Sequence, residues 1–63
     1  MITLLNPEAH EVTSAVIVQE DDGFFKIVVN IGSIQHINYK KTVNDLQRYF
    51  RDKFAMEKCK WSK

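Results

Sequence analysis

Residues 42–61 have the sequence TVNDLQRYFRDKFAMEKCKW, the one segment long enough to form an ordinary globular helix. Its apolar residues recur at intervals of three, four, four and seven. At about 100° per residue, these residues fall on one stripe that is roughly 80° wide. The stripe consists of Val43, Leu46, Phe50, Phe54 and Trp61, with Tyr49 and Lys53 at one margin. The pattern predicts a C-terminal amphipathic helix that needs an apolar surface to pack against.

Capping residues indicate where this helix begins and ends. Thr42 is a suitable N-cap, and Asp45, three residues later, makes a short version of the capping box. Lysines near the other end interact favourably with the negative end of the helix dipole, which stabilises the helix. We therefore expect the helix to run from Thr42 to about Lys58. In such a helix Cys59 lies about 180° from Phe50, on the solvent side.

The chain before the helix predicts a small antiparallel sheet. β-branched and apolar residues in 11–20 indicate a first strand, and the sequence FFKIVVNI in 24–31 indicates a second. The dipeptide Asp22-Gly23 between them is a strong hairpin signal. We expect a two-residue turn at this dipeptide.

That two-residue turn decides which side chains share a face of the sheet. It places Val18 opposite Ile27. The face that these two residues share is continuous and apolar, so we assign it to the helix. Its other members are Val16, Phe25, Val29 and Ile31. The opposite face carries Ala15, Ile17, Phe24 and Val28, and it is too apolar to be ordinary solvent surface.

A third strand, 34–39 (IQHINY), follows a second tight turn formed by a Gly-Ser pair. A two-residue loop at this turn places His36 on the helix side of the sheet and Ile37 and Tyr39 on the outside. A slip of one residue sends Ile37 and Tyr39 into the core instead. The slipped register buries more apolar surface, whereas the Gly-Ser pair suits the two-residue loop. The sequence leaves both registers open.

These elements predict an α+β fold in a single small domain, residues 1–63. An antiparallel three-stranded β-meander packs on one C-terminal amphipathic helix. Residues 2–5 are mostly apolar, and they form either a short fourth N-terminal strand or a strip that covers the outer sheet face. Asn6-Pro7-Glu8 has the residues of a helix start and supports a single turn at most.

Composition indicates a soluble folded protein with a small core. Hydrophobic residues make up 44% and charged residues 27% of the chain, which is unlike a disordered protein. A chain of this size buries only about 60% of the surface that its unfolded form exposes. Cys59 is the only cysteine, so no disulfide within the chain can stabilise it. Self-association is the expected remaining source of stability.

The sequence shows neither a membrane-spanning segment nor a secretory signal, and this predicts where in the cell the protein lies. No run approaches the roughly 20 apolar residues that a membrane span needs. The first five residues have no basic start and no long apolar run, so they do not resemble a secretory signal. Together with the lone cysteine, these observations predict a cytoplasmic protein.

Charge is distributed unevenly along the chain. Residues 1–25 contain five acidic residues and no Lys or Arg, whereas 26–63 contain nine basic and three acidic residues. The two parts therefore carry −5 and +6. We favour an interpretation in which the acidic first strand and its turn lie near the basic helix. The alternative is a basic face directed at an anionic partner, but the overall balance of charge is unlike that of a strong nucleic-acid binder.

Five basic residues form a candidate nucleic-acid-binding surface: Lys40, Lys41, Arg48, Arg51 and Lys58. Arg binds phosphates bidentately, and amides at a helix N-terminus attract anions. The order of three strands and a helix resembles the arm-type DNA-binding domain of phage integrases, which implies DNA contacts from exposed strand residues such as Lys26 and Lys40. It is also similar to the last three strands and final helix of double-stranded-RNA-binding domains, whose first helix has no counterpart here.

The outer face of the predicted sheet is the other candidate site. Contiguous exposed apolar area on a small domain usually marks an interface. The predicted protein interface consists of Ile17, Phe24, Val28, Ile37 and Tyr39. Cover by the chain's own residues, namely Ile2, Leu4 and Leu5, satisfies the same physical need and is an equal alternative.

Few residues suggest catalysis or metal binding. A Cys-His nucleophile needs His36 and Cys59 in one cleft, and the predicted helix directs Cys59 away from the sheet. Only two glycines are present, which leaves no Gly-rich phosphate loop, and His10 and His36 show no metal-ligand spacing. We expect no enzyme activity, no metal and no cofactor.

The sequence therefore predicts a small, non-enzymatic interaction or regulatory protein that binds another protein or forms a homodimer. A small DNA- or RNA-binding module that uses the basic flank of the helix is the alternative. Neither a membrane nor a small-molecule substrate is an expected partner.

Overall fold

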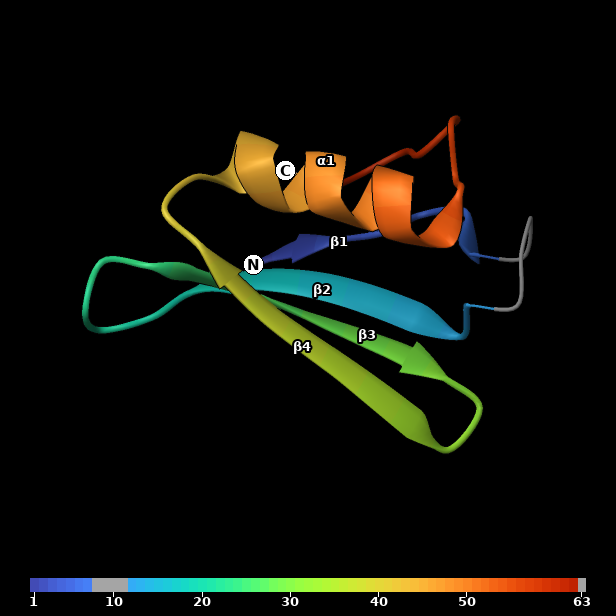
Figure 1. The fold of residues 1–63 in the computed structure, drawn as a ribbon, viewed down its shortest axis with the longest axis horizontal. Helices are drawn as coiled ribbons and strands as arrows, with labels where there is room; N and C mark the ends of the chain where they lie inside the picture. The colour runs from blue at the N-terminus through green and yellow to red at the C-terminus, as the bar shows by residue number, and fades with distance from the viewer. Residues whose placement is uncertain (8–11, 63) are drawn as a thin grey trace.

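The computed structural model describes residues 1–7 and 12–62, which form a four-stranded antiparallel sheet with one helix on one face (Figure 1). The elements are β1 (Ile2–Thr3), β2 (Ser14–Gln19), β3 (Phe25–Ile31), β4 (Ile34–Lys40) and α1 (Val43–Phe54). The strands lie side by side in sequence order, and each neighbouring pair is antiparallel. The predicted α+β fold is confirmed, and β1 is the short fourth strand that the sequence allowed.

The β2–β3 hairpin closes with a three-residue loop, whereas the sequence predicted two residues. Glu20 and Phe24 flank the loop, and the Glu20 N–H donates to the Phe24 carbonyl over 2.8 Å. Gly23 has a φ of +88°, a left-handed conformation that glycine adopts without steric cost. The Asp22 carboxylate accepts a further bond from the Phe24 N–H over 2.9 Å. A turn that ends in a left-handed glycine is the common form of the three-residue hairpin loop.

The extra loop residue exchanges the two faces of β2. Ile17, not Val18, lies opposite Ile27. Ile17 is only 1% exposed, so its predicted place on the outer face and in the protein interface is wrong. Val16 and Val18, which were predicted to face the helix, lie on the outer face instead. The predicted face of β3 is correct, because Ile27 and Val29 are fully buried on the helix side.

The β3–β4 turn has the two-residue loop that the Gly-Ser pair favours. Ile31 pairs with Ile34 across the loop, and the glycine has a φ of +60°. Of the two registers that the sequence left open, this one places His36 on the helix side and Ile37 and Tyr39 outside. Backbone preference at the turn therefore outweighs the larger apolar burial of the slipped register.

The C-terminal segment, residues 58–62, returns along the edge of the sheet beside β1 (Figure 1). Its backbone contacts are a bridge between Leu4 and Trp61, a bond from the Leu5 N–H to the Lys60 carbonyl (2.7 Å) and a bond from the Ser62 N–H to the Thr3 carbonyl (2.8 Å). The Asn6 side chain donates to the Lys58 carbonyl over 2.7 Å and accepts from the Lys60 N–H over 2.9 Å. Asn6, predicted as a helix cap, thus holds the two ends of the chain together.

The N-terminal residues belong to the sheet and do not fold across its outer face. Ile2 pairs with Ile17, and Leu4 is buried in the same core. Of the two alternatives for this segment, the short strand is the one that forms. Glu8, which the sequence placed in a helical turn, and His10 lie outside the described residues.

Helix α1 begins at the predicted cap and presents its apolar stripe to the sheet. The Thr42 hydroxyl accepts a bond from the Asp45 N–H over 3.1 Å, which confirms Thr42 as the N-cap. Leu46 and Phe50, at the centre of the stripe, are fully buried. The 3.6-residue period of the apolar side chains therefore identified the buried side of the helix correctly.

The helix ends at Phe54, before the predicted end at Lys58. Ala55 adopts a left-handed conformation with a φ of 55°, and the Met56 N–H donates to the Arg51 carbonyl over 3.2 Å. The bond from Met56 is the longer-range of the two bonds in a Schellman cap. The turn places Met56, which is 1% exposed, in the core. Burial of this side chain outweighs the helix propensity of the residues that follow Phe54.

The core lies between α1 and the inner face of the sheet. Its buried members are Leu4, Val12, Ala15, Ile17, Ile27, Val29, Leu46, Phe50 and Met56. Trp61, predicted to lie on the helical stripe, reaches the core from the C-terminal segment and meets the Phe50 ring edge-on, with centroids 5.3 Å apart. His36 meets the Phe54 ring edge-on at 5.6 Å. The stripe and the C-terminal segment therefore share one aromatic cluster.

Replacing Ala55 by glycine is expected to stabilise the protein. A non-glycine residue in the left-handed region costs roughly 1–2 kcal/mol, part of which glycine loses again through its greater freedom in the unfolded chain. The Ala55→Gly variant is expected to raise the free energy of unfolding by roughly 0.5–1 kcal/mol, measured by urea titration. As a control, Gln47→Gly inside the helix is expected to lower the free energy of unfolding by about 1 kcal/mol. Destabilisation by both substitutions would contradict the assigned cap.

Candidate interaction surfaces

The outer face of the sheet carries an apolar row that crosses three strands. Val16 on β2 pairs with Val28 on β3, and Val28 pairs with Ile37 on β4. Directly paired side chains on one face have Cβ atoms about 4.5–5.5 Å apart, so the three residues form a continuous strip. The two valines are half-buried by their neighbours, and Ile37 is 47% exposed.

A second row lies beside the first. Val18 pairs with Lys26, and Lys26 pairs with Tyr39, which is 52% exposed. The Lys26 ammonium lies 3.4 Å from a Glu20 carboxylate oxygen, so its charge is directed toward the hairpin end of the row. Phe24 is two residues before Lys26 and therefore on the same face. We define the outer patch as Val16, Val18, Phe24, Val28, Ile37 and Tyr39.

A polar row bounds the outer patch on its other side. Ser14 pairs with Asn30, which pairs with Gln35. The Asn30 amide donates to the Ser14 hydroxyl over 2.9 Å, and the Gln35 amide donates to the Asn30 side-chain oxygen over 3.1 Å. The outer patch is thus limited by bonded amides at one end and by the Lys26–Glu20 ion pair at the other.

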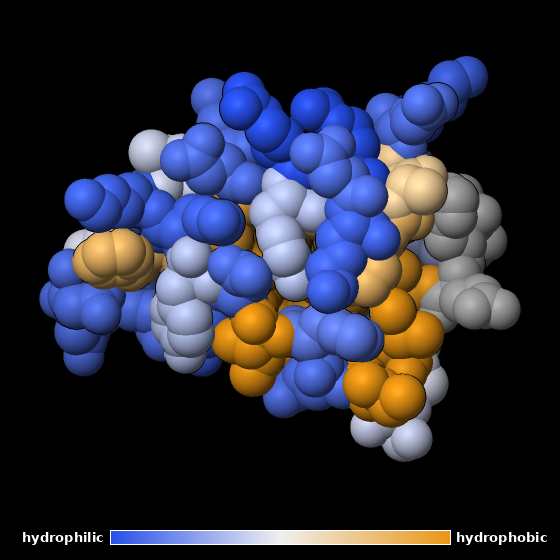
Figure 2. Space-filling model, in the orientation of Figure 1, coloured by the Kyte–Doolittle hydropathy of each residue, from blue (hydrophilic) through white to orange (hydrophobic). Residues whose placement is uncertain are grey.

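No described segment covers the outer patch. Helix α1 lies on the opposite side of the sheet and the C-terminal segment lies at its edge (Figure 1). Figure 2 shows apolar atoms at the surface on the side of the molecule where β4 runs, in contrast to the hydrophilic surface of α1. The N-terminal residues therefore do not cover the outer patch, which was the alternative that the sequence offered.

The predicted interface residues fall into two groups. Phe24, Val28, Ile37 and Tyr39 lie on the outer patch, whereas Ile17 lies in the core. Sequence reasoning missed Val16 and Val18 because it assumed a two-residue turn. The third residue of the Asp-Asp-Gly loop was the signal that could have assigned them, since a left-handed glycine at the end of a three-residue loop is common.

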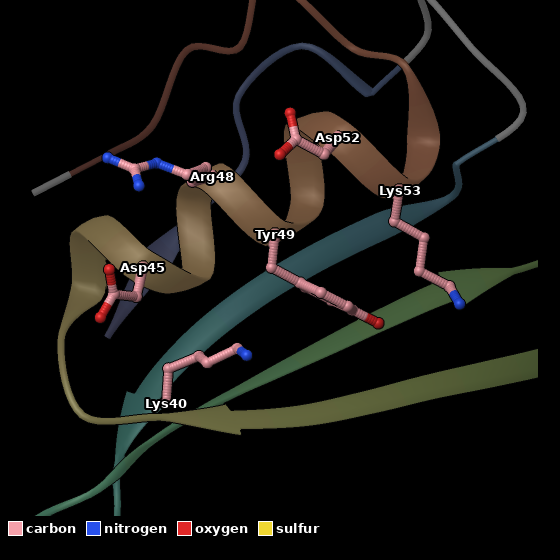
Figure 3. A pocket seen from close by; sticks show the side chains of 6 residues that line it. All are labelled: Lys40, Asp45, Arg48, Tyr49, Asp52 and Lys53. Atoms are coloured by element: carbon pink, nitrogen blue, oxygen red, sulfur yellow. The ribbon is translucent and has the colours of Figure 1, made fainter.

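A shallow groove lies between α1 and the end of β4 (Figure 3). It has a volume of ≈ 560 Å³ and is lined by Lys40, Asp45, Arg48, Tyr49, Asp52 and Lys53. The Lys40 and Lys53 ammonium groups and the Tyr49 hydroxyl extend along the side of the helix that faces β4, whereas Arg48 and Asp52 point away from the sheet (Figure 3). Three cations and two carboxylates share the groove, so its net charge is small.

The five basic residues of the candidate nucleic-acid site do not share one surface depression. Lys40 and Arg48 line the groove, together with Lys53, which was not in the predicted set. Arg51 lies on the side of the helix near Cys59, where its charge acts on the thiol. The Lys58 carbonyl binds the Asn6 side chain, which places Lys58 in the C-terminal segment. Lys41 is exposed just before the N-cap.

Cys59 and His36 are not brought together. His36 packs against Phe54. Cys59 is half-buried against the core, and its thiol donates to the Met56 carbonyl over 2.9 Å, so the predicted solvent-side position is wrong. Burial raises the pKa of the Cys59 thiol, and the nearby Arg51 charge opposes this increase. A raised pKa keeps the thiol protonated and unreactive at neutral pH.

Within residues 1–7 and 12–62, no group of three or more His, Cys, Asp or Glu side chains is placed to hold a metal ion. No helix among these residues is long and apolar enough to cross a membrane. Comparison with models of protein families, with curated proteins and with solved structures found no match.

Proposed function

We propose that this protein is a non-enzymatic interaction or regulatory module that binds a protein partner through the outer patch. The partner is either a second copy of the chain or a different protein. The observation that carries the proposal is the exposure of Ile37 and Tyr39 beside the valines of the two apolar rows. Contiguous apolar surface with a polar rim is typical of protein interfaces.

The composition of the outer patch and the size of the domain support this proposal. Tyr39 and Phe24 supply aromatic side chains, which contribute a large share of binding energy at interfaces. A chain of 63 residues has a small core, so a partner that covers the patch adds burial that the monomer lacks. The separation of His36 from Cys59 supports a role other than nucleophilic catalysis. The single free thiol suits a reducing compartment, and we propose the cytoplasm.

Photo-crosslinking from the outer patch tests the proposal. We expect p-benzoylphenylalanine in place of Tyr39 to give a discrete cross-linked product, in the purified protein or in an extract of its source cells. A product of twice the 7.4 kDa chain mass indicates a second copy, and another mass indicates a different protein. The same probe at Asn44, which is exposed on α1, is the control and is expected to give no product. Equal yields from both positions, or no product from Tyr39, would contradict the proposal.

Nucleic-acid binding is the second candidate function, and the groove beside α1 is the observation that favours it. Lys40, Arg48 and Lys53 line this groove, and Tyr49 offers a ring on which a base can stack. The two carboxylates in the same groove repel phosphate, which is why this candidate ranks second. Sedimentation at low salt with an added DNA duplex or RNA strand distinguishes the two functions, because only the second requires a complex with the nucleic acid.

A further inference from the structure

The two edges of the sheet differ in whether the chain itself covers them. The β1 edge is covered by the C-terminal segment through the bridge between Leu4 and Trp61. At the other edge, β4 pairs with β3 alone in the part of the chain that the structure describes. β4 is seven residues long, whereas β1 has two residues. A long unpaired strand edge is a template for pairing with another strand.

The register of the sheet shows which backbone groups of β4 face the open edge. In an antiparallel sheet, the backbone groups of successive residues point alternately to the two neighbouring strands. The Glu20 N–H bonds to the Phe24 carbonyl, so the even-numbered residues of β3 bond to β2. The odd-numbered residues of β3 therefore bond to β4. Their partners on β4 are residues 34, 36, 38 and 40. The N–H and C=O groups of Gln35, Ile37 and Tyr39 therefore point away from β3, toward the open edge.

β4 has only one of the features that usually prevent edge pairing, namely the charged Lys40 at its C-terminal end. Edge strands are commonly protected by proline, by bulges, by inward-pointing charges or by very short length. Residues 34–39 (IQHINY) contain no proline, glycine, acid, Lys or Arg, and their register with β3 is unbroken. Ile34 is 61% exposed and Ile37 is 47% exposed along this edge. The edge is thus regular and accessible, and it carries a single charge at one end.

We propose that the protein forms a homodimer in which two copies pair antiparallel along β4 about a two-fold axis at Ile37. This inference goes beyond the proposed function, because edge pairing joins the outer patches of the two copies side by side and does not cover them. The axis places Gln35 opposite Tyr39 of the second copy, so that every outward N–H and C=O group finds a partner. Lys40 lies opposite Ile34 of the second copy, which keeps the two Lys40 charges at opposite ends of the ladder.

This register also joins the apolar rows of the two copies. Antiparallel pairing that aligns odd-numbered residues with odd-numbered residues keeps both outer faces on the same side. The row of Val16, Val28 and Ile37 then continues directly into the same row of the second copy. An axis at His36 or Asn38 preserves the faces but leaves residues unpaired at one end of each strand. The axis at Ile37 pairs all seven residues of β4.

Single cysteines on β4 test the register of the proposed dimer, in a Cys59→Ser background. Ile37→Cys places two thiols at a pair whose Cα atoms lie about 5.5 Å apart, within disulfide range. Mild oxidation is expected to convert most of this variant to a covalent dimer. Gln35→Cys alone is expected to give little, because its two copies lie roughly 13 Å apart. A mixture of Gln35→Cys and Tyr39→Cys chains is expected to give the mixed dimer.

A proline on β4 tests the role of the backbone edge. Ile37→Pro removes an N–H that the monomer does not use, so the monomer remains folded. Dimerisation measured by sedimentation is expected to weaken roughly tenfold to a hundredfold, because the two ladder bonds at the axis are lost. Asn38→Pro is the control. Its N–H bonds to β3, so this variant is expected to lose stability as a monomer.

The outcomes separate this inference from the proposed function. An Ile37→Cys chain that stays monomeric, or equal cross-linking of all three cysteine variants, overturns the β4 pairing. If the Tyr39 photoprobe then still captures a different protein, the outer patch remains the binding surface and only the β4 pairing is wrong. If the photoprobe captures nothing, both proposals fail.

Discussion

Replacing Phe50 with alanine is expected to leave most of the protein unfolded at room temperature. Phe50 is fully buried and packs against the rings of Phe54 and Trp61, with centroids 5.2 and 5.3 Å away. Removing a buried phenylalanine side chain costs about 3–5 kcal/mol, because both its burial and the contacts around it are lost. The core of a domain this small supplies no more than about 3–5 kcal/mol of net stability. Loss of the helical circular dichroism signal in the absence of urea is the measurement.

The control for this prediction is the same substitution at an exposed phenylalanine. Phe24 is 37% exposed at the hairpin end of the sheet. Phe24→Ala is expected to change the free energy of unfolding by less than about 1 kcal/mol, as surface substitutions usually do. Similar losses of stability in the two variants would contradict the placement of Phe50 at the centre of the core.

Removal of the chain from Lys60 onward is expected to destabilise the protein almost as strongly. The deletion removes the half-buried Trp61 ring, which covers Phe50, and the backbone bonds of residues 60–62 to β1. Burial of a large aromatic ring contributes about 2–3 kcal/mol, and each of the two backbone bonds contributes about 1 kcal/mol. We expect a loss of roughly 3–5 kcal/mol in urea titrations.

Hydrogen exchange localises the effect of this deletion. The amides of Leu5 and Thr3 lose their acceptors in the C-terminal segment, so they are expected to exchange faster than the amides of β3 in any molecules that remain folded. Ser62→Ala is the matched control, because it removes only the bond from the Thr3 N–H to the Ser62 hydroxyl and leaves the Trp61 ring in place. A truncated chain with the unfolding midpoint of the full chain would show that the C-terminal segment does not support the core.

The sequence correctly predicted the buried side of α1, its N-cap and the inner side of β3. The apolar period identified Leu46 and Phe50 as the buried side of α1, and the N-cap was found because a threonine hydroxyl satisfies a backbone amide only three residues away. Alternation identified Ile27 and Val29 as the inner side of β3. Each of these features depends on residues close together in the sequence, so local physics is sufficient to specify them.

The outer patch was predicted only in part, and the reason is register. Phe24 and Val28 were placed correctly because both belong to the β3 side of the hairpin, whose alternation does not depend on the loop. Ile17 was misplaced because one additional loop residue reverses every side chain of β2. Both faces of β2 are apolar, with Ala15 and Ile17 on one and Val16 and Val18 on the other, so alternation alone does not decide which face enters the core.

The amino-acid order alone specified an α+β fold and the buried side of its helix, since these follow from the spacing of the apolar residues, and it left two registers open for the last strand. Only the tertiary structure decided where the helix stops, which face of β2 enters the core and which edge of the sheet stays open. Met56 and Trp61 leave the helix because burial of Met56 in the core, and the contacts of Trp61 with Phe50 and with the distant Leu4, stabilise them more than further helical turns do. Such contacts have no local signature, and they leave β4 as the open edge.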